Sequence, residues 1–245
     1  MSASRIPHDQ LIMGVHPIQE LLRHAPDRLI RIFAVQGRQK ETVERAQEKR
    51  IPISFVREEE LSRMVDSDSH QAMVAHVKGR KFLSVKEFLD NLGDRPATVV
   101  LLDSIMDPQN FGAILRSCDC FGVAGVVWSK NRGSDLTPIA AKTSCGASEW
   151  LPLLRVANLA NAAEELIEAG FDAIATLPGE GAESLYEAKF TARTLLMLGS
   201  EGEGLQPLLR KRATRSLFIP MCGRIGSLNV AQSAAVFLSH LRQFP

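Results

Sequence analysis

From residue 97 to the C-terminus, short apolar runs alternate with longer amphipathic stretches. The first run, Thr98–Leu102, is apolar at nearly every position instead of alternating, which is typical of a parallel strand buried on both faces. The pattern predicts further strands at 125–128, 171–176, 194–198 and 216–219, and helices at 110–121, 139–145, 159–169, 205–213 and 229–241. Strands and helices that alternate in this way predict an α/β fold with a parallel sheet.

The first 78 residues have shorter elements and a more charged pattern. A helix opens at Gly14–Pro17, with the proline in its first turn. Strands are predicted at 30–35, 51–56 and 70–77, and helices at 41–49 and 58–65. Pro52 favours an edge position for its strand, because proline cannot donate a hydrogen bond to a neighbouring strand. We therefore predict a small N-terminal α/β domain over 1–78, a linker over 79–96 and a larger domain over 97–245.

The last predicted strand and helix are joined by a glycine-containing turn. Pro220 ends the strand, and Gly223 and Gly226 allow the backbone to turn sharply. Ser227 is predicted as the N-cap of the helix at 229–241. One face of that helix is apolar and carries Val230, Ala234, Phe237 and Leu241. The N–H groups at such a helix start can bind a ligand, although a purely structural connection explains the pattern equally well.

A second glycine-rich loop, Gly199–Gly204, follows the strand predicted at 194–198. Its glycine spacing, G-x-x-G-x-G, is the reverse of the dinucleotide-binding fingerprint, and no Gly-Lys-Ser/Thr follows as in a phosphate-binding P-loop. The loop therefore indicates close approach of the backbone to a ligand other than a dinucleotide.

Charge gives no sign of a polyanionic partner for the chain as a whole. Lys+Arg number 29 and Asp+Glu 28, so RNA would have to bind local basic patches. Two candidates are Lys78–Lys81 and the cluster of Arg210, Lys211, Arg212 and Arg215. Solvated surface explains the first as well as a phosphate contact does, and stabilisation of a helix C-terminus explains the second equally well.

The four cysteines do not form a metal or redox motif. Cys118 and Cys120 are too close for a zinc or thioredoxin-like pair, so we predict buried free thiols and no metal. No apolar run approaches the roughly 20 residues of a membrane helix, and residues 1–10 lack the apolar core of a signal peptide. A cytoplasmic location is expected.

Three segments together resemble the signature motifs of the SpoU (TrmH-type) RNA 2′-O-methyltransferases of the SPOUT superfamily. They are Asp107–Arg116, Leu198–Leu205 and Ile219–Val230, in the order and with spacing similar to the family's. Gly14–Pro17 and His70–Gln71 resemble landmarks of the family's N-terminal RNA-binding domain, which is similar to a ribosomal-protein fold. Ala72 departs from the family's usual glycine, and we expect His16 and His70 to make structural hydrogen bonds.

This resemblance implies a cofactor, S-adenosyl-L-methionine, bound in a C-terminal trefoil knot. Backbone groups at Gly199, Ile219 and Leu228 would hold its adenine and ribose, and Leu177 and Gly204 would belong to the same pocket. The knot follows from the resemblance alone, since threaded chains are rare.

Methyl transfer to a ribose 2′-hydroxyl needs the hydroxyl in line with the methyl, removal of its proton, and stabilisation of the charge that develops on oxygen. By resemblance, Arg116 is the essential arginine, Glu201 its ion-pair partner, and Asn110, Ser227 and Asn229 fix the arginine, the substrate and the loop. A guanidinium is a poor base because its pKa exceeds roughly 12, so Arg116 is expected to orient and stabilise, with the proton acceptor left open. Taken one at a time, three of these residues also have structural explanations: Arg116 as a surface arginine, Asn110 as an N-cap, and Glu201 as a carboxylate at a helix start.

Over nearly the whole chain, the resemblance is to members that methylate the 2′-oxygen of a guanosine in 23S ribosomal RNA, which is the expected activity. The same chemistry on transfer RNA is an alternative, and a non-catalytic RNA-binding or ribosome-assembly factor is another. The resemblance also implies a homodimer. The C-terminal helix supports this with more apolar residues than one buried face needs: Val236, Phe237, Leu238, Leu241 and Phe244.

Overall fold

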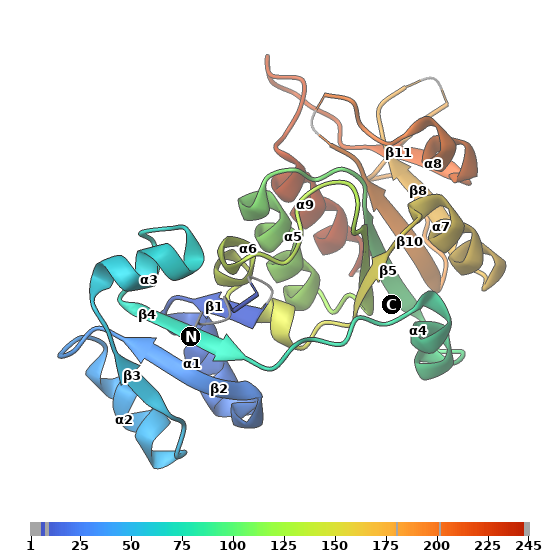
Figure 1. Cartoon of the computed structure of the whole chain (residues 1–245). Helices are drawn as coiled ribbons and strands as arrows, with labels where there is room; N and C mark the ends of the chain where they lie inside the picture. The colour runs from blue at the N-terminus through green and yellow to red at the C-terminus, as the bar shows by residue number, and fades with distance from the viewer. Residues whose placement is uncertain (1–5, 8–9, 180, 201, 243–245) are drawn as a thin grey trace. The chain divides into compact units, whose positions relative to one another are not determined.

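The computed structural model describes residues 6–7, 10–179, 181–200 and 202–242. Internal contacts divide the chain into two compact units (Figure 1). The first comprises residues 1–81 and 136–150, and the second comprises 82–135 and 151–245. Each unit has a sheet of its own, so each is described separately.

The first unit contains a four-stranded sheet in the order β1-β4-β2-β3. Its strands are β1 (Leu11–Met13), β2 (Leu29–Ala34), β3 (Ile53–Phe55) and β4 (Met73–Val77). Its helices are α1 (Val15–His24), the 3₁₀ helix η2 (Pro26–Arg28), α2 (Lys40–Glu48) and α3 (Glu58–Val65). β3 lies at the edge of the sheet, as Pro52 predicted, and pairs with β2 in parallel. β4 begins later than predicted because Gln71 and Ala72 have φ of 54° and 62°, outside the β region.

The turn before β4 brings the two N-terminal landmark segments together. The Oε1 atom of Gln71 accepts a hydrogen bond from the N–H of Val15 at 3.1 Å. A Cβ on Gly14 would lie 2.9 Å from that oxygen, which explains the glycine. His70 is buried, its Nδ1 accepts from the N–H of Ala72 at 3.1 Å, and its Nε2 lies 3.1 Å from the Oγ of Ser62. The structural role predicted for His70 is therefore confirmed.

Residues 136–150 belong to the first unit, although they fall within the sequence range predicted for the C-terminal domain. They form α6 (Pro138–Thr143) and the 3₁₀ helix η3 (Ala147–Glu149). Ile139 packs against the apolar cluster around Leu61. The Glu149 side chain is 2% exposed and pairs with Arg80 at 2.7 Å and with Arg28. Burial lowers the pKa of Arg80, and the attraction of Glu149 opposes that shift.

The second unit contains seven parallel strands in the order β7-β6-β5-β10-β8-β11-β9. They are β5 (Ala97–Leu102), β6 (Gly125–Ser129), β7 (Leu153–Val156), β8 (Asp172–Thr176), β9 (Glu183–Ser184), β10 (Arg193–Leu198) and β11 (Arg215–Phe218). The parallel sheet predicted from the continuous apolar runs is confirmed. The predicted elements did not include β7 and β9.

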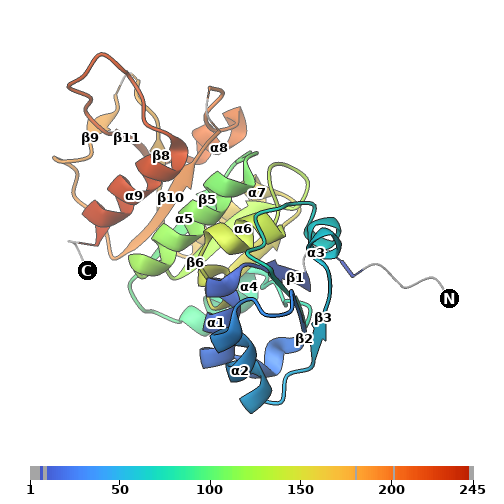
Figure 2. The same cartoon turned by 90° about the vertical axis from the view of Figure 1, so that its left-hand side faces the viewer.

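Helices cover both faces of this sheet, which accounts for its continuous apolar strands (Figures 1 and 2). On one face, α4 (Val85–Leu92), α7 (Leu159–Glu168) and α8 (Pro207–Arg212) contribute to a single apolar core. On the other face, α5 (Pro108–Cys120) and α9 (Val230–Leu241) pack side by side. Although α4 falls within the predicted linker, it contributes Val85, Phe88 and Leu92 to this core.

The cysteines depart partly from the prediction of buried thiols. Cys118 is buried, and burial raises the pKa of its thiol. Cys120 and Cys222 are exposed, so the prediction is wrong for both. Cys120 is the last residue of α5, and Cys222 lies on the exposed loop after β11.

Candidate active site

The three sequence motifs begin at one edge of the second unit's sheet. Because all strands are parallel, their carboxyl ends share this edge, which is where open α/β sheets bind ligands. Gly199 directly follows β10, Leu177 follows β8, and Ile219 follows β11, on three adjacent strands. The Asp107 motif follows the neighbouring strand β5 after a short loop. The topology therefore gathers segments that are far apart in the sequence.

The glycine-rich loop after β10 closes tightly on itself. Ser200 and Gly204 exchange two backbone hydrogen bonds, at 3.2 and 3.0 Å. A Cβ on Gly199 would lie 2.2 Å from the carbonyl carbon of Gly204, so no other residue fits there. A Cβ on Gly204, whose φ is +68°, would lie 3.0 Å from the Cδ2 of Leu177. Three of the predicted cofactor residues, Gly199, Gly204 and Leu177, are thus brought together.

The first and third motifs are joined by a pair of asparagines. The Nδ2 of Asn229 donates to the Oδ1 of Asn110 at 2.9 Å, across 119 positions of sequence. The Oδ1 of Asn229 accepts from the N–H groups of Ala231 and Gln232, at 2.8 and 3.4 Å. Asn229 is therefore the N-cap of α9, and the prediction that Ser227 caps this helix is wrong. The helix starts later than predicted, which puts Ser227 out of capping position.

Asn110 is not a helix cap either. The side chain of Asp107 caps α5 by accepting from the N–H of Gln109 at 2.9 Å. Asn110 stands in the first turn of α5, half-buried, and its side-chain oxygen is bonded to Asn229. The alternative explanation of Asn110 as an N-cap is therefore wrong.

Arg116 lies further along α5 and its side chain is exposed. Within the described residues it makes no hydrogen bond and no ion pair. Its predicted partner, Glu201, lies outside the described residues. Ser227 and Leu228 stand exposed on the loop between β11 and α9, and Leu228 is 38% exposed. The structure places these two on the loop that leads to Asn229, without a hydrogen bond from the Ser227 side chain to any other described residue.

A buried carboxylate that the sequence analysis did not single out supports the glycine-rich loop. Asp103 follows β5 and is 0% exposed. Its carboxylate accepts from the backbone N–H of Gln206 at 2.7 Å and from the side-chain amide of the same residue. The Oε1 of Gln206 in turn accepts from Arg132 at 2.8 Å. The sequence signal that was available for this position is an aspartate directly after an apolar parallel strand.

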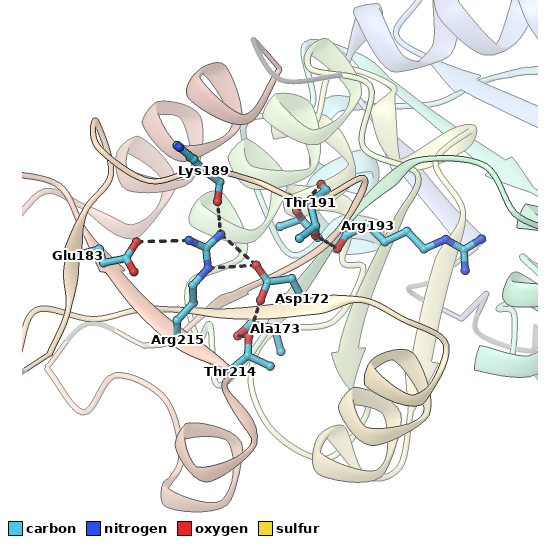
Figure 3. A network of polar contacts seen from close by, with 9 residues as sticks. Asp172, Ala173, Glu183, Lys189, Thr191, Arg193, Thr214 and Arg215 are labelled. Carbon is cyan, nitrogen blue, oxygen red and sulfur yellow. Dashed lines mark hydrogen bonds and ion pairs between the residues drawn. The ribbon is translucent and has the colours of Figure 1, made fainter.

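The arginines of the basic cluster after the second motif make hydrogen bonds and ion pairs within the chain. Arg210 donates to the carbonyls of Leu205 and Glu203, and Arg212 pairs with Glu164 at 2.6 Å. Arg215 pairs with Asp172 at 2.9 Å and with Glu183 at 3.3 Å, and it donates to the carbonyl of Lys189 (Figure 3). Of the two explanations for this cluster, these three arginines favour the structural one.

In the described part of the chain, no group of three or more His, Cys, Asp or Glu residues is placed to hold a metal ion. Nor is any described helix long and apolar enough to span a bilayer.

Comparisons with known proteins match both units. The model of the SpoU rRNA Methylase family matches residues 97–239, and a model described as RNA 2′-O ribose methyltransferase substrate binding matches 11–83. Proteins named 23S rRNA (guanosine-2′-O-)-methyltransferase RlmB are similar: the Haemophilus influenzae one is 34% identical over 93% of this chain and 94% of its own. The Escherichia coli K12 one is 35% identical over 94% and 96%.

Solved structures share the fold. The SpoU methyltransferase AviRb from Streptomyces viridochromogenes, in complex with AdoMet, has a TM-score of 0.79 at 25% identity and covers 95% of this chain and 89% of its own. An AdoMet-bound rRNA methyltransferase from Sinorhizobium meliloti has a TM-score of 0.75 at 21% identity over 95% and 86%, which shows likeness of fold.

Proposed function

The chain belongs to the SpoU rRNA methylase family, and we propose that it transfers a methyl group from S-adenosyl-L-methionine to the ribose 2′-oxygen of a guanosine in 23S ribosomal RNA. The observation that carries this proposal is that all three motifs begin at the carboxyl edge of the parallel sheet, with the first and third joined by the Asn110–Asn229 hydrogen bond. The relatives named for that reaction match over 93% or more of this chain, including both units.

The cofactor is assigned to the loops after β10, β8 and β11. The tight Gly199–Gly204 loop has no side chain on its glycines, so a ligand can approach the backbone closely. Leu177 and Ile219 are half-buried apolar residues at the same edge, suited to the face of an adenine ring, and Leu228 completes the set. When bound, the cofactor supplies the methyl group. A trefoil knot of the chain around this site is part of the proposal.

The chain's own residues would position and stabilise the attacking oxygen. Arg116 presents an exposed planar guanidinium, which can orient a ribose oxygen or its phosphate and stabilise charge that develops there. Glu201 is proposed to hold that guanidinium. Asn110 and Asn229 fix the start of α5 against the start of α9, and Ser227 on the adjacent loop contacts the substrate. The group that accepts the hydroxyl proton is not assigned.

RNA recognition is assigned to the N-terminal unit, which matches the substrate-binding model over residues 11–83. Because the proposed substrate is ribosomal RNA, the enzyme would work in the cytoplasm. A homodimer is also proposed, but the apolar residues of α9 support it less than expected. Phe237, Leu238 and Leu241 are already buried within one chain, Val236 is half-buried, and Phe244 lies outside the described residues.

The experiment uses purified protein, S-adenosyl-L-methionine labelled in its methyl group, and two substrates in parallel: 23S rRNA transcribed without modifications and bulk unmodified transfer RNA. The expected result is label on one guanosine 2′-oxygen of the 23S rRNA only. Label in transfer RNA would establish the alternative substrate. No transfer to either RNA by protein that binds the cofactor would overturn the proposed activity.

A further inference from the structure

A cavity of about 270 Å³ lies in the second unit, at the carboxyl ends of β6 and β7. It contains none of the residues assigned to the cofactor. Its polar lining comes from the ends of these strands and the starts of α7 and α8: Ser129, Asn131, Arg132, Asn158 and Gln206. Leu208, which is 52% exposed, stands at the same cavity. The lining therefore combines one cation, several hydrogen-bonding groups and an exposed apolar surface.

Arg132 is the charged group of this lining, and no carboxylate is among the residues that form it. Its guanidinium donates to the Oε1 of Gln206 at 2.8 Å. Among the described residues this is its only hydrogen bond, and it has no ion pair, although a guanidinium carries five N–H donors. By contrast, Arg155 and Arg212 pair with carboxylates, at 2.7 and 2.6 Å. Arg132 therefore has no direct ion-pair partner among the described residues, and the nearest carboxylate that it is linked to, Asp103, is buried behind Gln206. Its remaining N–H donors suit an anion with planar oxygen acceptors, such as a phosphate.

The size and composition of the cavity suit a single nucleotide. At about 270 Å³ the cavity is close to the lower end of the range for ligand sites, about 300–1,000 Å³, which is room for one nucleotide-sized group. A phosphate on Arg132, with a sugar or base against Leu208, matches the mixed lining. A single nucleotide of a longer strand is therefore the ligand that fits the chemistry.

The order of the strands places this cavity in line with the candidate active site. Along the carboxyl edge, the ends of β7 and β6 come first, then β5 with the Asp107 motif, then β10 and β8 with the cofactor loops. Gln206 belongs to both regions, because it lines the cavity and is bonded to the buried Asp103 at the end of β5. Because α5 covers one face of the sheet and α7 and α8 cover the other, a strand that presents its ribose at Asn110 reaches Arg132 by crossing the carboxyl edge.

We infer that this cavity binds a nucleotide that flanks the methylated ribose, with Arg132 as the contact to its phosphate. The inference rests on the proposed function, since it names a further contact of the same RNA substrate. It predicts that Arg132 contributes to RNA binding through its charge and leaves cofactor binding to the neighbouring loops.

The test measures binding of a 23S rRNA fragment that the wild-type enzyme methylates, over a series of salt concentrations. Arg132→Gln keeps a side-chain N–H donor for Gln206 but removes the charge, and Arg132→Lys keeps the charge. The slope of log affinity against log salt is negative, and its magnitude should decrease by about 0.7 for Arg132→Gln, the value for one phosphate contact on a single strand. Arg132→Lys should keep the wild-type slope. The KM for RNA should rise several-fold in Arg132→Gln, and the KM for S-adenosyl-L-methionine should not change.

Arg95→Ala is the matched control. Arg95 is an exposed arginine just before β5, at the opposite edge of the sheet, and it donates to the carbonyls of Leu92 and Asn91. Its removal should leave the salt slope unchanged. A folded Arg132→Gln protein with a wild-type slope and KM for RNA would overturn the inference while leaving the proposed function in place. A wild-type protein that methylates no RNA would instead reject the proposed function.

A second readout needs no substitution. A photoreactive 4-thiouridine placed beside the target guanosine should crosslink, in the wild-type complex, to residues 129–132 or 206–208. Crosslinks confined to other parts of the second unit would contradict the inference even if every Arg132 variant failed to fold.

Discussion

The two edges of the seven-stranded sheet use the same kinds of side chain in opposite ways. At the amino edge, Arg215 and Arg193 begin their strands and have internal acceptors. Arg215 pairs with Asp172 and Glu183 (Figure 3), and Arg193 donates to the carbonyl of Ala169. Arg132, which follows β6 at the carboxyl edge, and Arg116, which lies about two turns into α5, are exposed and make no ion pair with any described residue. Charges whose partners lie within the chain stabilise the fold, whereas charges without them are available to a ligand. The comparison predicts which arginines affect stability and which affect chemistry.

The largest effect is expected for Arg116→Ala. Methyl transfer should fall 100-fold or more, the scale seen when one preorganised donor to a transition state is removed. Cofactor affinity should change by less than about 1 kcal/mol, because the cofactor is assigned to other loops. Single-turnover transfer and cofactor titration measure the two quantities. Arg116→Lys should not restore transfer, because a point charge does not replace a planar fork. Near-normal turnover by a folded Arg116→Ala protein would remove this residue from the mechanism.

Gly199→Ala is expected to act on the cofactor loop. Its Cβ would lie 2.2 Å from backbone atoms that cannot move aside, so the loop must open. We expect cofactor affinity to fall at least tenfold in isothermal titration, which is about 1.4 kcal/mol. Gly179→Ala is the control, since a Cβ there meets nothing within 4 Å. Equal affinities for the two variants would show that the loop after β10 does not form the cofactor site.

Asn229→Ser tests the two roles of Asn229 separately, as the N-cap of α9 and as the hydrogen-bond donor to Asn110. Serine is a good N-cap, so α9 should keep its stability to within about 0.5 kcal/mol. The serine side chain is too short to reach Asn110, so α5 and α9 lose their tie and transfer should fall about tenfold through misplacement. Asn229→Ala removes the cap as well and should cost about 0.5–2 kcal/mol of stability in denaturant unfolding. If Asn229→Ser transfers methyl groups at the wild-type rate, the asparagine tie is structural only.

The smallest effect on transfer is expected for Arg215→Ala, at the amino edge. This variant loses hydrogen bonds to Asp172, Glu183 and the Lys189 carbonyl and should lower the free energy of unfolding by about 1–3 kcal/mol. Measured below its unfolding temperature, its rate of transfer should equal that of the wild type. A reduced rate or weaker RNA binding by the folded variant would mean that the basic cluster contacts substrate after all.

Local sequence patterns predicted most of the second unit, and the misses have physical causes. The runs around Thr98–Leu102 and 194–198 are apolar because helices cover both faces, so periodicity alone identifies them as parallel strands. Ser227 and Asn229 are both good cap residues in one loop, and only the packing of α9 against α5 selects Asn229.

Other features depend on contacts between distant segments. The packing of residues 136–150 with the first unit follows from the pairing of Glu149 with Arg80 and Arg28, which no local pattern contains. The arginines of the basic cluster look like surface charges in the sequence, and only the fold shows that Arg210, Arg212 and Arg215 all have internal partners. Motif resemblance identified the proposed site residues, whereas Asp103 lies outside the motifs, and its bonds to Gln206, 103 positions away, are seen only in the folded chain.

The most direct test of the proposed activity maps 2′-O-methylation across total RNA from cells with the gene, without it, and with the gene encoding Arg116→Ala. We predict that one guanosine of 23S rRNA is methylated with the gene and unmethylated in the other two strains. Full methylation of 23S rRNA in the strain without the gene, or loss of a transfer RNA methylation instead, would contradict the proposed function.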